Sequence, residues 1–129
     1  MAGLGPEAMG LRDRGMAAWI GAGLLVLTAL FHLSGFAAIP ASDEAGFFDL
    51  AMRPLWLFAG AHWLLLAVIG LMPVGRGVRL AIAAALLLDA ALLAWFVGPF
   101  IGAATLAASG AAFAVNGLRA DRQVTAPSE

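Results

Sequence analysis

Long apolar segments dominate the pattern of hydrophobic and polar positions along the chain. Residues 16–39 and residues 54–72 are each about as long as a bilayer-crossing helix, which needs about 20 residues at about 1.5 Å per residue. Residues 78–118 are apolar for about twice that length, and Gly98-Pro99 interrupts them near the middle. Because this pair is typical of a tight turn, the run divides into spans 78–97 and 99–118.

This pattern predicts an all-α integral membrane protein, a single domain of four transmembrane helices in an up-down bundle. The second span opens on Pro54, at a position that helices tolerate, and residues 119–129 form a short flexible tail. The first span follows Arg12 and Arg14 as a signal peptide would. It is longer than a typical apolar signal region of about 7–15 residues, so we expect it to be retained. The composition agrees, since charged residues make up 12% of the chain against about 25% in soluble domains.

The arginines predict the orientation of the bundle. Two arginines precede the first span, two lie between the second and third spans, and two follow the fourth, whereas the first connection is acidic. By the positive-inside rule, both termini lie in the cytoplasm and the protein is a multi-pass protein of the inner (plasma) membrane. The residues are Arg12, Arg14, Arg76, Arg79, Arg119 and Arg122, against Asp43, Glu44 and Asp49 with Arg53 in the first connection.

Each span also carries one polar group at a similar depth in the outer half of the bilayer. His32, His62, Asp89 and Thr105 all lie about 9–12 Å from the outer end of their helices. A carboxylate within a span costs several kcal/mol unless it is paired, protonated or wetted. We therefore expect His62 to meet Asp89, with His32 completing the cluster across the bundle.

Helical periodicity places small and hydroxyl residues in stripes on the first and fourth spans. Such stripes let membrane helices approach closely, so these faces should point into the bundle. The stripes are Gly21, Leu25, Thr28, His32 and Gly35 on the first span, and Gly102, Thr105, Ser109, Ala112 and Asn116 on the fourth.

Three kinds of ligand suit the polar residues. His32, His62 and Asp89 are the ligand set of a two-histidine, one-carboxylate metal site, although no local ligand spacing such as HxxxH supports it. His32 and His62 could ligate haem b axially, but consecutive helices about 8–10 Å apart leave little room for a macrocycle. The third candidate is a lipophilic ligand held by the same residues.

Two functions without a bound cofactor remain open. The chain could be an accessory or assembly subunit whose Trp63 and alanine-rich faces meet other membrane subunits or a second copy of itself. It could also be a small proton-coupled transporter, although the polar residues of the inner half offer little for a complete route. Beyond these, the bilayer is the expected partner. The net charge of −1 gives no reason to expect nucleic acid, and the lack of cysteine excludes thiol chemistry. The sequence predicts no catalytic residues.

Overall fold

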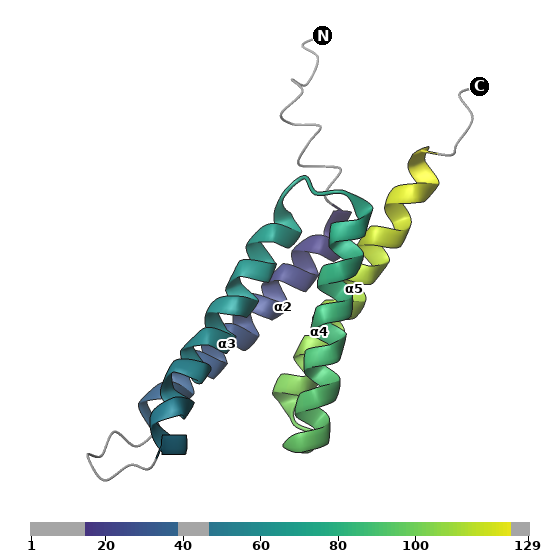
Figure 1. Ribbon diagram of the computed structural model, residues 1–129. Helices are drawn as coiled ribbons and strands as arrows, with labels where there is room; N and C mark the ends of the chain where they lie inside the picture. The colour runs from purple at the N-terminus through teal and green to yellow at the C-terminus, as the bar shows by residue number, and fades with distance from the viewer. Residues whose placement is uncertain (1–14, 39–46, 125–129) are drawn as a thin grey trace, which may run out of the picture.

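The computed structural model describes residues 15–38 and 47–124, and these residues form helices without any strand. Figure 1 shows the long helices, each of which is long and apolar enough to cross a membrane. This is the architecture of a small multi-pass membrane protein, as the hydrophobic pattern predicts. The elements are α2 (Gly15–Ser34), the short 3-10 helix η1 (Gly35–Ala38), α3 (Phe47–Leu71), α4 (Arg76–Phe96) and α5 (Ile101–Val124).

The helix ends agree with the predicted spans except at the start of α3 and the end of α5. Helix α5 continues to Val124, so the prediction of a flexible tail over residues 119–129 is wrong for residues 119–124. The predicted turn between the last two spans is confirmed, since α4 ends at Phe96 and Gly98 has a φ of 96°, which favours glycine. Pro54, by contrast, lies inside α3 and does not open it. A proline there removes one backbone hydrogen bond, and the rest of the helix continues past it. Asp43 and Glu44 lie outside the described residues.

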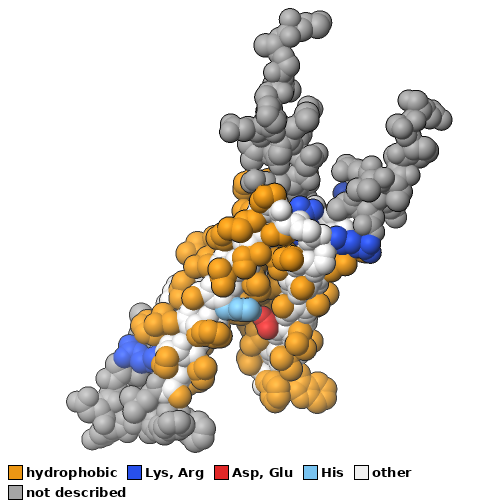
Figure 2. Space-filling view, turned by 45° about the horizontal axis from the view of Figure 1, so that its top comes forward, with side chains coloured by type: hydrophobic (Ala, Val, Ile, Leu, Met, Phe, Trp, Pro, Cys, Tyr) orange, Lys and Arg blue, Asp and Glu red, His pale blue; other side chains and the backbone are white. Residues whose placement is uncertain are grey.

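The helices do not pack in chain order. Helix α2 packs along both α3 and α5, and α4 packs along α5, whereas α3 and α4 touch at few places. Figure 1 shows α3 and α4 close together at their short connection and apart beyond it. The neighbours across the bundle are therefore α3, α2, α5 and α4. In the space-filling view of Figure 2, the two arms of the molecule separate away from the connected end, which leaves an opening between α3 and α4.

The core is built from small residues and a few large side chains that fill the space between helices. Phe113 is fully buried. Its ring lies 3.2 Å from the position of a Cβ at Gly21 and would overlap a Cβ at Gly70, so one side chain of α5 packs against both α2 and α3. The buried hydrophobic cluster comprises Ala22, Leu25, Ala29, Trp63, Ala67, Ile82, Ala83, Leu86, Ala90, Leu106 and Phe113.

Polar side chains join α2 to α5. The hydroxyl oxygens of Thr28 and Thr105 lie 2.7 Å apart, and Thr105 is also 2.9 Å from the carbonyl oxygen of Gly102. Thr28 can therefore donate to Thr105 while Thr105 donates within its own helix. Ser109, which is fully buried, donates to the carbonyl oxygen of Gly21 over 2.7 Å. Hydrogen bonds between helices replace the water that these groups lack in a bilayer.

The predicted stripes are confirmed along most of this interface. Gly21 and Thr28 of α2 and Ser109 and Asn116 of α5 are all buried. Gly102 is the exception, because a Cβ there would overlap the ring of Phe100 in the preceding turn. The prediction that Gly102 faces a neighbouring helix is therefore not confirmed by these contacts.

Candidate functional site

The carboxylate of Asp89 lies on α4 and faces α3. The indole Nε1 of Trp63 donates a hydrogen bond to Asp89 Oδ2 over 3.1 Å. His62, the preceding residue of α3, places its Nε2 3.8 Å from the same oxygen. We call His62, Trp63 and Asp89 the Asp89 cluster. Because α3 and α4 touch at few places, these side chains form the polar part of their contact.

The prediction that His62 lies beside Asp89 is confirmed. Their separation of 3.8 Å is an ion-pair distance if the imidazole is protonated, but it exceeds the usual hydrogen-bond range of about 2.7–3.2 Å. Phe58, one turn earlier, lies parallel to the imidazole with ring centroids 6.2 Å apart. The imidazole is therefore near the carboxylate without being tied to it.

His32 belongs to a different set of contacts. Its Nε2 donates to the carbonyl oxygen of Trp56 over 2.9 Å, and the indole Nε1 of Trp56 donates back to the carbonyl oxygen of His32. The two rings are stacked, with centroids 4.1 Å apart and planes 10° from parallel. These reciprocal bonds fasten the end of α2 to α3.

Trp63 stands between His32 and Asp89. The edge of the imidazole meets the indole at a centroid distance of 4.9 Å and an interplanar angle of 69°, while the indole N–H turns away to Asp89. Trp63 is 6% exposed, so the expectation that it meets a partner is wrong. Sequence reasoning missed its role, although a buried indole N–H usually needs an acceptor and Asp89 was the strongest acceptor at that depth.

The three predicted metal ligands do not converge in the described residues, which contain no group of three His, Cys, Asp or Glu side chains that could hold a metal ion. His32 also uses Nε2 as a donor to Trp56, and a nitrogen that carries this proton has no lone pair for a metal or a haem iron. The metal site of His32, His62 and Asp89 and the axial haem pair of His32 and His62 remain predictions without support from this geometry.

The Asp89 cluster is accessible from one side. The side chains of His62 and Asp89 are 37% and 31% exposed. In Figure 2 a histidine and an acidic side chain lie together on an otherwise mostly hydrophobic face. The cluster therefore offers carboxylate oxygens that accept hydrogen bonds, and an imidazole that donates or accepts, to a molecule arriving between α3 and α4.

No polar route continues from the Asp89 cluster through the described helices. The hydroxyl side chains of Thr28, Thr105 and Ser109 lie between α2 and α5 and bond to one another or to backbone carbonyls. These hydroxyl groups therefore lie at the interface of α2 with α5, whereas the Asp89 cluster lies between α3 and α4. The arrangement therefore favours binding at the cluster over proton conduction across the bundle.

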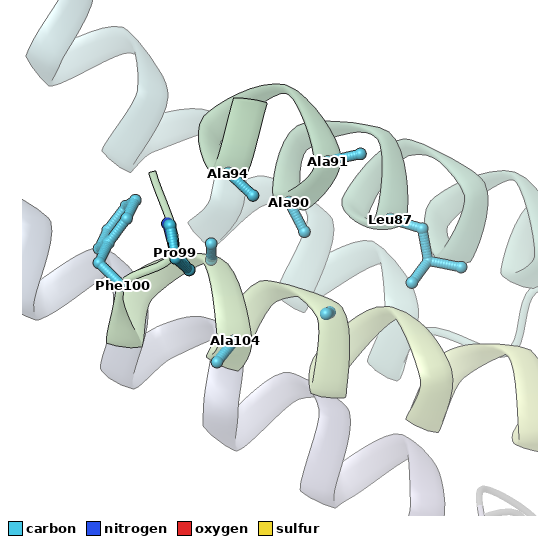
Figure 3. Close-up of a pocket in the computed structure, with 9 residues that line it drawn as sticks. Leu87, Ala90, Ala91, Ala94, Pro99, Phe100 and Ala104 are labelled. Carbon is cyan, nitrogen blue, oxygen red and sulfur yellow. The ribbon is translucent and has the colours of Figure 1, made fainter. Parts of the chain in front are cut away.

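A hollow lies between α4 and α5 beside their connecting turn, away from the Asp89 cluster (Figure 3). It has a volume of about 410 Å³ and lacks any polar side chain, so it offers no chemistry beyond apolar contact. Its lining consists of Leu87, Ala90, Ala91, Ala94, Pro99, Phe100, Ala103, Ala104 and Ala107.

Comparisons of the chain with protein-family models, with curated proteins and with solved structures find no match. The function is therefore argued from the Asp89 cluster and its surroundings alone.

Proposed function

We propose that the chain is an up-down bundle in the inner (plasma) membrane with both termini in the cytoplasm. The support is the arginine pattern: Arg76 and Arg79 between the second and third spans, and arginines before the first and after the fourth. Reporter fusions after Glu44 and after Glu129 test this topology. The proposal requires the two fusions to report opposite sides, and the same side for both would overturn it.

We propose further that the Asp89 cluster binds the polar head of a lipophilic molecule that enters from the bilayer between α3 and α4. The observation that carries this proposal is the exposure of the Asp89 and His62 side chains, 31% and 37%, within apolar spans. A carboxylate left in contact with hydrocarbon is unfavourable by several kcal/mol. A ligand that donates a hydrogen bond to it would offset part of this cost.

Each residue of the cluster would have its own part in binding. Asp89 would accept a hydrogen bond from a hydroxyl or amine of the ligand. His62, whose Nε2 is 3.8 Å from the carboxylate, would form a second hydrogen bond with the same group of the ligand. Trp63 would hold the carboxylate toward the opening through its N–H. His32 would act only by supporting Trp63 from behind.

A pair of matched probes tests the proposal. A decyl-substituted hydroquinone has the donor groups that the cluster needs, and its dimethyl ether has the same apolar body without donors. We expect the hydroquinone to raise the unfolding temperature of the protein in lipid nanodiscs and the ether to leave it unchanged. Asp89→Leu should abolish the shift, whereas Ala104→Leu on the hollow between α4 and α5 should retain it.

Equal shifts from the two probes, or a shift that survives Asp89→Leu, would overturn this assignment. A second candidate occupant of the same opening is a polar helix of another membrane subunit, since it too could pair with an exposed Asp89. Copurification of another subunit that is lost in Asp89→Leu, together with no response to the hydroquinone, would favour an accessory role.

A further inference from the structure

The N-termini of α2 and α4 meet at one end of the bundle, against the same turn of α5. The side-chain oxygen Oδ1 of Asn116 lies 2.9 Å from the position of a Cβ on Gly15, the first residue of α2. The next residue of α5, Gly117, would place its Cβ 3.5 Å from the Cβ of Arg79 in the first turn of α4. Two helix N-termini therefore converge on residues 116 and 117.

The two helix N-termini at this end lack the acidic residues that usually accompany them. A helix N-terminus carries roughly half a positive charge, which acidic residues of the first turn usually balance. Neither α2 nor α4 has an acidic residue in its first turn, and the N-cap of α4, Gly75, makes no side-chain capping bond. Among the described side chains, those of Arg76 and Arg79 in the first turn of α4 and Arg119 of α5 lie near this end.

Two buried donors at this end have no acceptor among the residues that the structure describes. Asn116 is 6% exposed, and its Nδ2 has no hydrogen-bond partner. The Nε of Arg79 is also buried without a partner. Buried N–H groups are nearly always paired in folded proteins, so an unpaired amide beside a helix N-terminus indicates a missing acceptor.

We propose that this end of the bundle binds the phosphate of an anionic phospholipid headgroup. The acceptor that two helix N-termini, an amide and an arginine share is an oxyanion, and phosphate is an oxyanion that arginine binds in a bidentate way. The position favours a lipid, because these residues begin or end apolar spans and therefore lie at headgroup depth. Exposed Met16 and Leu118 flank the site and would contact the acyl chains.

Lipid-dependent stability tests the proposal. The full chain is reconstituted in nanodiscs of phosphatidylcholine with and without phosphatidylglycerol, and its unfolding temperature and its retention of phosphatidylglycerol in native mass spectrometry are measured. We expect phosphatidylglycerol to raise the unfolding temperature. Arg79→Gln should weaken its retention about fivefold, which is the loss of about 1 kcal/mol that one arginine contributes at an anionic surface. Asn116→Leu, a change of similar size without donors, should also weaken it.

Arg53→Gln is the matched control. The Nε of Arg53 is likewise buried without a hydrogen-bond partner, but this guanidinium lies over the ring of Phe36, 5.0 Å from its centroid, and away from both helix N-termini. It should retain phosphatidylglycerol as the unchanged protein does.

Several results would overturn the proposal. One is equal stabilisation by the two lipids. Another is an equal loss of retention in Arg53→Gln and Arg79→Gln, which would indicate general attraction to a negative surface. A third is equal protection by inorganic phosphate at millimolar concentration in phosphatidylcholine, which would make this a site for soluble phosphate. Unfolding temperatures in pure phosphatidylcholine show whether each variant is folded, so a misfolded variant is not counted as a loss of binding.

Discussion

The interface between α2 and α5 and the contact between α3 and α4 use polar residues in opposite ways. In the first, hydroxyl groups at Thr28, Thr105 and Ser109 bond across closely packed helices and leave no opening. In the second, a carboxylate and an imidazole meet across helices that touch at few places and remain about one third exposed. The difference teaches that a polar residue in an apolar span stabilises packing when its partner closes the gap, and leaves polar atoms available to another molecule when the gap stays open.

The largest expected effect comes from placing an extra methyl group in the core around Phe113. In Gly70→Ala the new methyl group would overlap the ring of Phe113, which is fully enclosed. We expect the free energy of unfolding to fall by about 1–3 kcal/mol, as overpacking a core usually costs. Unfolding by a denaturing detergent in mixed micelles measures this.

Gly23→Ala is the control for that change, since nothing lies within 4 Å of a Cβ at Gly23. It should stabilise the protein slightly, because alanine favours a helix over glycine by about 0.5–1 kcal/mol. Equal stability of the two variants would show that the core around Phe113 is packed more loosely than the structure indicates.

A smaller effect should follow from removing one hydrogen bond between α2 and α5. Ser109→Ala removes the donor to Gly21 and should lower the free energy of unfolding by about 0.6 kcal/mol, the average for bonds between membrane helices. Ser34→Ala removes a hydroxyl that bonds to Phe31 within its own helix at an exposed position and should cost less. If both substitutions leave the free energy of unfolding unchanged, hydroxyl hydrogen bonds do not stabilise the interface between α2 and α5.

The smallest effect should be the coupling of His62 to Asp89. In double-mutant cycles with Asp89→Leu, Trp63→Phe should show the larger coupling because its indole makes a true hydrogen bond. His62→Leu should show a smaller one, since the pair is 3.8 Å apart and open to the surroundings. The double variant His62→Leu with Asp89→Leu should unfold about as the unchanged protein does while losing the response to the hydroquinone. If the coupling of His62 to Asp89 exceeds that of Trp63, His62 is the main partner of the carboxylate and the pair serves to hold α3 against α4.

The fold was predictable to the extent that it follows from hydrophobic length and period. The spans follow from the apolar length that a bilayer needs, and the packing of Thr28 and Ser109 follows from the 3.6-residue period of a helix. The start of α3 was not predictable, because Pro54 is unfavourable inside a helix but does not prohibit one. The order of neighbours was not predictable either, because consecutive spans need not pack along their whole length.

The candidate site was predictable in part. The pairing of His62 with Asp89 follows from their similar depth on consecutive helices, and the structure brings them together. Depth alone also placed His32 in the same cluster. His32 does not join the cluster, because the indole of Trp63 lies between His32 and Asp89 and because Trp56 forms a hydrogen bond with the imidazole of His32. Which aromatic ring separates two polar groups depends on the rotation of each helix and on side-chain rotamers, and neither is encoded in spacing.

The position of Phe113 has a mechanical consequence. Its ring fastens α2, α3 and α5 together near the connection between α3 and α4, so it acts as a pivot close to one end of the opening. Beyond Phe113, α3 and α4 have few contacts with each other, so their packing offers little resistance to a change in the angle between them. The separation of His62 and Asp89, 3.8 Å in this conformation, would change with that angle, and so would the fit of a molecule bound between them.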